Sequence, residues 1–115
     1  MKTDKELLIL AAKAAGYYET KYVFAKNGPE EKCWHLGGDR YSTGWNPLTD
    51  DGDALLLAIN LKFKIDIKTI VVSVEQISES SNSFIESCEN NDESRLSATR
   101  RAIVRAAAAI GEGME

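Results

Sequence analysis

The sequence predicts a single α+β domain in which three helices and four strands follow one another in the order α-β-β-α-β-β-α. Capped segments with apolar residues at helical spacing occur at both ends of the chain and in its middle. Alternating apolar and polar residues, broken by turn formers at short intervals, fill the segments between them. We therefore expect the strands to form a small, mostly antiparallel sheet.

The composition is that of an ordinary folded domain. The chain has 115 residues, 43% hydrophobic and 28% charged, which is enough for a core without disulfides or metals. Its net charge of −4 argues against a protein that binds nucleic acid over its whole surface. The charged start does not resemble a signal peptide and no apolar run is long enough for a bilayer, so we expect a cytoplasmic protein without membrane contact. In that compartment Cys33 and Cys88 are expected to be free thiols.

The first helix is expected over residues 4–15. Thr3 and Glu6 have the spacing of a capping box, and Gly16 is a natural residue for the helix C-terminus. Ile9 points away from the apolar stripe and is expected to be exposed.

A β-hairpin is expected next, with residues 21–26 paired to residues 31–36 across the turn signal Asn27-Gly28-Pro29. Residues 39–53 then look like an ordered loop, because turn formers dominate it while Tyr41, Trp45 and Leu48 pin it to the core.

The second helix is expected over residues 51–61, with Asp50 or Asp51 as its N-cap and Asp53 in its first turn. Its apolar surface is unusually wide and is made by Leu55, Leu56, Leu57, Ile59 and Leu61. We expect this helix to be covered on two sides or to be partly buried by a partner.

A long β-rich stretch follows the second helix. Its apolar residues first occupy odd positions (Phe63, Ile65, Ile67) and then even positions (Ile70, Val72, Val74). Such a change turns every side chain to the opposite face, so a bend or bulge is expected at 68–69, with the main strand at 69–76. A polar turn at 78–83 leads to a return strand at 84–88.

The last helix is expected over residues 93–110, capped by Asn91 or Asp92 and ended by Gly111. Its core stripe is predicted to contain Leu96, Ile103, Ala107 and Ile110. Arg101 and Arg105 lie opposite the stripe, on a face expected to be solvated, and Arg100 lies at its edge, where it is expected to pair with an acidic residue near the sheet.

Three stretches are distinctive as sequence: Met1–Leu8, Trp45–Leu55 and Arg100–Ala107. In this order, and over nearly the whole chain, they resemble the phage ABA sandwich family, a group of small proteins of bacteriophages and prophages. The resemblance implies an α/β/α sandwich made in the bacterial cytoplasm, and it implies no activity, catalytic residue, cofactor or metal. The family's loop motif maps onto Trp45, Asn46, Pro47, Asp50, Gly52 and Asp53.

The segment Trp45–Asp53 has two interpretations. In a ligand site, Trp45 would stack on a ring and the aspartates would bind a cation. In a structural segment, Trp45 covers the core, Pro47 fixes the turn and the aspartates cap the second helix. The bidentate glutamate that ends an EF-hand loop is absent from the sequence, so we favour the structural interpretation.

Other chemistries have weak support. Cys33 and His35 share a strand face and, with Cys88, suggest a metal site or an activated thiol, but the chain has one histidine and no CxxC motif. Ordinary packing explains them better. Gly37–Arg40 is either an anion-binding turn or a plain strand end. Residues 93–115 carry four arginines and three glutamates, and the last helix has no aromatic residue, which makes nucleic-acid binding through it weak.

We therefore expect non-catalytic binding, without a cofactor, to a host or phage protein or to a second copy of the chain. One alternative is a small-ligand binder or minor enzyme that uses loop 37–53, and another is a weak nucleic-acid binder that uses the last helix. The candidate binding-surface residues are Trp45, Asn46, Asp50, Asp53, Leu56, Arg101 and Arg105.

Overall fold

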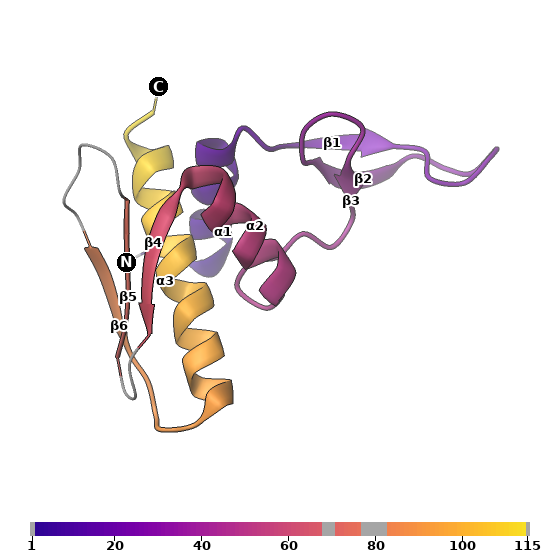
Figure 1. Ribbon diagram of the computed structural model, residues 1–115. Helices are drawn as coiled ribbons and strands as arrows, with labels where there is room; N and C mark the ends of the chain where they lie inside the picture. The colour runs from indigo at the N-terminus through magenta and orange to yellow at the C-terminus, as the bar shows by residue number, and fades with distance from the viewer. Residues whose placement is uncertain (1, 68–70, 77–82, 115) are drawn as a thin grey trace.

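The described residues form three helices and two antiparallel three-stranded sheets, in the order α-β-β-β-α-β-β-β-α (Figure 1). The computed structural model describes residues 2–67, 71–76 and 83–114. The elements are α1 (Asp4–Ala15), β1 (Tyr18–Tyr22), β2 (Glu31–His35), β3 (Tyr41–Ser42), α2 (Asp51–Leu61), β4 (Phe63–Ile67), β5 (Val71–Gln76), β6 (Ser83–Ser87) and α3 (Asp92–Glu112). The predicted α+β class is confirmed, but the described strands number six in two sheets, where four strands in one sheet were expected.

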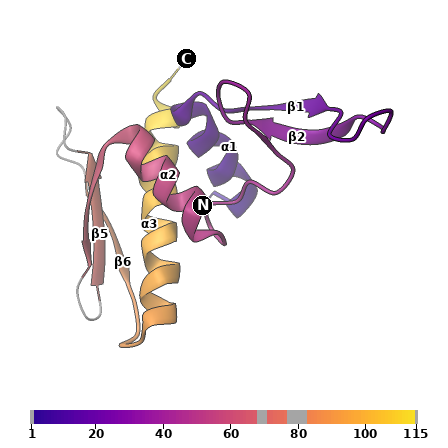
Figure 2. The ribbon, with the colours of Figure 1, turned by 45° about the vertical axis from the view of Figure 1, so that its right-hand side comes forward.

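Helix α3 lies between a sheet and a pair of helices (Figures 1 and 2). The sheet β4-β5-β6 covers one side of α3, and α1 and α2 pack against its other side. Because it is covered from two directions, α3 buries far more than one stripe. Its buried residues are Ala98, Ala102, Ile103, Val104, Ala106, Ala107, Ala108 and Gly111. Most are small, which lets both neighbouring layers approach the helix axis closely.

The predicted core stripe of α3 is wrong at Leu96, whose side chain is 47% exposed. The first turns of α3 extend past α1 and α2, so this end of the helix is covered less than its middle (Figure 1). Helical spacing identifies which residues share a face, but it does not show how far the neighbouring elements reach.

Gly111 lies inside α3 and does not end it, contrary to the sequence prediction. A Cβ atom at this position would lie 1.9 Å from the backbone oxygen of Leu10 in α1. The helix instead continues to Glu112 and is capped by Gly113. Glycine is therefore needed at position 111 for the close approach of two helices, since any side chain would collide with the α1 backbone.

The predicted caps of the first two helices are confirmed. Thr3 accepts a hydrogen bond from the backbone N–H of Glu6 at 3.2 Å, and Gly16 adopts the left-handed conformation that follows α1 (φ 80°). Asp50 accepts from the backbone N–H of Asp53 at 2.7 Å and so caps α2. These short-range bonds explain why both helices begin and end where the sequence indicates.

The change of apolar phase after the second helix marks a reversal of the chain. Strands β4 and β5 pair antiparallel, with Ile65 opposite Val74 and Phe63 opposite Gln76. In this register each odd-numbered residue of β4 faces an even-numbered residue of β5. One sheet face therefore carries the odd positions of β4 and the even positions of β5. Strand β5 lies within the main strand predicted at 69–76, and β4 is a further strand before it. The bend predicted at 68–69 lies outside the described residues, as does most of the turn at 78–83.

The first sheet begins earlier than predicted. Strand β1 spans Tyr18–Tyr22 and pairs with Glu31–His35, so residues 23–30 form a wider connection than the expected turn. The loop expected at 39–53 contributes the short strand β3, which pairs with β2. Gly37 and Gly38 both have positive φ angles (93° and 55°), which allows the chain to reverse tightly enough for this pairing.

Candidate functional site

Trp45 is a core residue. Its side chain is 5% exposed, and its ring lies 5.6 Å from that of Tyr17, edge to face, and 5.2 Å from that of Trp34. A ring enclosed in this way is not free to stack on a ligand. The geometry agrees with the structural interpretation of this segment and leaves the alternative site in loop 37–53 without its aromatic platform.

The polar residues of the same segment hold one another in place. The backbone N–H of Asn46 donates to the carboxylate of Asp53 at 2.9 Å, and the Asn46 side chain accepts from the backbone of Leu48 at 3.0 Å. Asp50 is occupied as the α2 cap. Within the described residues, no group of three or more histidine, cysteine, aspartate or glutamate side chains is placed to hold a metal ion.

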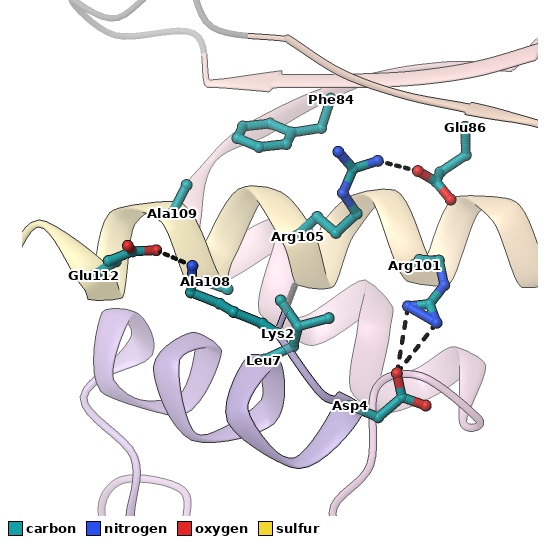
Figure 3. A pocket seen from close by; sticks show the side chains of 10 residues that line it. All are labelled: Lys2, Asp4, Leu7, Phe84, Glu86, Arg101, Arg105, Ala108, Ala109 and Glu112. Carbon is teal, nitrogen blue, oxygen red and sulfur yellow. Dashed lines mark hydrogen bonds and ion pairs between the residues drawn. The ribbon is translucent and has the colours of Figure 1, made fainter.

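Arg101 and Arg105 line a groove of about 680 Å³ between α1, α3 and β6 (Figure 3). The expectation that both lie on a freely solvated face is wrong, because β6 and the start of α1 lie beside them. Arg101 pairs with Asp4 at 3.1 Å, and Arg105 pairs with Glu86. Lys2 and Glu112 form a third pair at 2.7 Å (Figure 3).

The groove is electrically balanced, since three cationic side chains along it face three anionic ones. Its remaining lining consists of Leu7, Phe84, Ala108 and Ala109. Each ion pair joins two separate segments, and pairs this exposed contribute about 0–1 kcal/mol each. The groove therefore has no net charge with which to select a phosphate backbone.

Arg100 is also engaged in a structural contact. Its guanidinium lies 2.6 Å from the carboxylate of Asp51 and donates to the backbone oxygen of Leu48 at 2.8 Å. The predicted acidic partner exists, but it stands at the start of α2 and not near the sheet. Arg100 thus fixes the end of the 45–50 segment against α3.

Among the described residues, helix α2 is covered on one side only. Leu57 is fully buried, whereas Leu55, Leu56 and Ile59 are 56%, 41% and 62% exposed. These last three residues, here called the α2 apolar face, form an apolar surface that no described element of the chain covers. Of the two outcomes predicted for this helix, coverage on both sides is excluded.

Cys33 and His35 take part in packing. Cys33 is buried and Cys88 is half-buried, and the two do not form a disulfide. The His35 ring is stacked on Tyr18 with centroids 4.7 Å apart, and its Nε2 lies 2.9 Å from the backbone oxygen of Gly38, to which it donates. That bond places the proton of a neutral ring on Nε2.

A row of aromatic side chains lies on one face of the first sheet. The register places Tyr18 opposite His35, and His35 opposite Tyr41, so the three share a face, which Tyr22 also joins by strand alternation. Tyr18, Tyr22 and Phe24 are 54%, 42% and 44% exposed. This surface is called the aromatic face below and comprises Tyr18, Tyr22, Phe24, His35 and Tyr41.

The rings of the aromatic face contact one another without interruption. Tyr22 and Tyr41 are stacked at 4.1 Å, Phe24 meets the edge of Tyr22 at 5.1 Å, and His35 lies 5.0 Å from Tyr41. Each such pair contributes about 0.5–1.5 kcal/mol beyond its buried area. Partial burial of the Tyr41 hydroxyl, then the nearby Tyr18, Tyr22 and Asp39, raise the pKa of Tyr41 above its usual value.

The first sheet projects from the helices, and its opposite face carries the connection to them (Figures 1 and 2). Trp34 lies on that opposite face and contacts Trp45. The sequence prediction missed the aromatic face because it began the first strand at residue 21. The signal was present in the alternating positions of Tyr18, Tyr22 and Phe24, but only the register shows that His35 and Tyr41 join them.

Comparison with protein families, curated proteins and solved structures finds no significant match to this chain. None of the helices in the described part of the chain has the length and apolar character needed to cross a bilayer. The fold and the surfaces together define a small α+β protein that projects an aromatic sheet face from a helical body.

Proposed function

We propose that this protein acts by binding another protein, without catalysis, and that the aromatic face is its binding surface. One observation carries the proposal: three large aromatic side chains, each more than 40% exposed, are joined into one row by ring contacts through Tyr41 and His35, at a sheet that stands away from the helical body. Contiguous exposed apolar surface marks interaction sites, and tyrosine is enriched among the residues that dominate binding energy.

The side chains of the aromatic face are also held in place before a partner binds. Ring-to-ring contacts already hold Tyr22 between Phe24 and Tyr41, so little side-chain freedom is lost when a partner docks. Tyrosine hydroxyls add hydrogen-bonding groups at the rim of an apolar surface. This combination suits a protein segment better than a small ligand, because the aromatic face is a row of rings and not a pocket.

The biological setting is part of the same proposal. The resemblance of residues 45–55 and of the two other stretches to the phage ABA sandwich family supports a bacteriophage or prophage accessory protein. Such a protein would meet a host or phage partner in the cytoplasm of a bacterial cell.

A peptide display library screened on the immobilised protein tests the proposal. We expect the wild-type chain to enrich a common sequence pattern, Tyr22→Ala to lose that enrichment, and Lys21→Ala, on the opposite sheet face, to keep it. Circular dichroism would first establish that both variants are folded. Equal enrichment by the wild type and Tyr22→Ala would show that the aromatic face is not the binding surface.

Self-association is the second candidate, and the α2 apolar face favours it. Leu55, Leu56 and Ile59 leave an uncharged surface on one helix, of the kind that two copies bury about a two-fold axis. Sedimentation velocity is expected to show a dimer for the wild type and a monomer for Leu56→Asp. A monomer at every concentration of the wild type would remove this candidate.

A further inference from the structure

Glu31 and the two lysines of strands β1 and β2 lie on opposite faces of the first sheet. The strand register places Glu31 opposite Tyr22, on the aromatic face. The two lysines of strands β1 and β2, Lys21 and Lys32, face each other on the opposite side, together with Glu19. Asp39 is exposed in the connection between β2 and β3, two residues before Tyr41. The aromatic face is therefore bordered by carboxylates, and the strand lysines are kept away from it.

Elsewhere in this chain, an aromatic ring next to a carboxylate holds an arginine side chain. The guanidinium of Arg105 lies 5.8 Å from the centre of the Phe84 ring and pairs with the carboxylate of Glu86 (Figure 3). A ring and a carboxylate placed as neighbours thus bind one cation between them, through the electron-rich ring face and the ion pair. At the aromatic face, Tyr22 and Glu31 are neighbours across two strands, but neither lysine of these strands lies on the same face.

We propose that the aromatic face binds an arginine- or lysine-rich segment of a partner protein, whose cationic side chains lie over the exposed tyrosine rings and pair with Glu31 and Asp39. This inference rests on the proposed function and names the chemistry of its partner. The complementarity has two parts, since rings attract the cations at short range and the carboxylates, with a net charge of −4 on the chain, attract them from farther away.

Single-stranded nucleic acid is the competing occupant of an exposed aromatic row, because bases stack on such rings. The carboxylates of Glu31 and Asp39 disfavour single-stranded nucleic acid at this surface. A phosphate backbone that follows the rings would pass Glu31 and Asp39, while Lys21 and Lys32 lie on the opposite face of the sheet. Like charges placed together in this way oppose binding.

Fluorescence anisotropy with three labelled probes tests the inference. The probes are a 12-residue peptide of arginine, glycine and serine, the same peptide with glutamate in place of arginine, and a 12-nucleotide single-stranded DNA. We expect binding of the arginine peptide alone, and a loss of at least about fivefold in its affinity for Tyr22→Ala, from the ring contact. Glu31→Gln, a surface change that leaves the rings in place, is expected to weaken binding about threefold or more.

Glu19→Gln is the matched control, because it removes the same charge from the opposite face of the same sheet. Binding that stays at the wild-type level in this variant supports the inference. An equal loss in Glu19→Gln and Glu31→Gln would overturn it, since net charge alone would then explain the attraction. Preferred binding of the DNA would overturn it as well.

The two proposals fail in different ways. If the display library enriches peptides without basic residues and Tyr22→Ala abolishes that enrichment, the aromatic face binds proteins but its preference for cations is wrong. If no peptide of any kind depends on Tyr22, the proposed function itself is wrong.

Discussion

Some residues in this chain have roles that follow from their neighbours in sequence, whereas the roles of others are set by residues on another element. Asp50 and Thr3 accept backbone hydrogen bonds from residues three positions away, so their roles follow from the local sequence. Gly111 has the same local signature as a helix-ending glycine, but its role is set by Leu10, a residue on another helix. Trp45 is likewise defined by Tyr17 and Trp34, which enclose its ring.

Replacement of Gly111 by alanine is expected to destabilise the protein. The added Cβ would lie 1.9 Å from the Leu10 oxygen, so α1 must move away from α3. Overpacking of this kind costs about 1–3 kcal/mol, which exceeds the gain of roughly 1 kcal/mol in helix propensity. Urea denaturation measures the free energy of unfolding.

Gly113→Ala is the matched control for this experiment. The nearest atom to a Cβ there is 3.6 Å away and the φ angle is −80°, so a change within about 0.5 kcal/mol is expected. Equal stability of Gly111→Ala and Gly113→Ala would contradict the close contact between α1 and α3.

At the scale of elements, helix α2 shows the difference between forming a helix and covering it. The Asp50 cap and the left-handed Lys62 (φ 58°) fix where the helix begins and ends. Three of its large apolar residues nevertheless stay exposed, because the rest of the chain reaches only the side that carries Leu57. The ends of this helix are a local property, whereas its burial depends on neighbours.

Loss of the α2 cap is expected to lower the stability of the whole chain. Asp50→Ala leaves the backbone N–H of Asp53 without its 2.7 Å acceptor, which costs about 1 kcal/mol. Asp50→Asn keeps an acceptor in place and is expected to stay within a few tenths of a kcal/mol of the wild type. Thermal melts followed by circular dichroism compare the two variants, and a similar fall in both would argue against the capping role.

At the scale of the whole molecule, the two sheets differ in how they are attached. The sheet β4-β5-β6 packs along α3 and places Val74, which is fully buried, in the core. The first sheet projects from the body and is joined to it through the contact of Trp34 with Trp45 (Figure 1). We expect the two parts of the molecule to differ in local stability for this reason.

Hydrogen exchange is expected to reveal this difference. Amide protons of Glu19–Lys21 in β1 should exchange with solvent well before those of residues 102–108 in α3. Opening of the first sheet exposes few core residues, whereas exposure of α3 requires global unfolding. Exchange at the same rate in both segments, measured by mass spectrometry or NMR, would show instead that the protein opens as one unit.

The sequence by itself determined the features that depend on residues a few positions apart. These are the bounds of α1 and α2, their caps, the α+β class and the alternating strands, since hydrogen bonds within one turn and the period of the apolar residues specify them. The tertiary structure alone decided which strands pair, which side of each element is covered and how Arg101 and Arg105 find partners on α1 and β6. An alternating strand has two faces, and only its neighbours decide which is buried. For this reason the aromatic face, built from Tyr18, His35 and Tyr41 on three strands, could not be identified before their register was known.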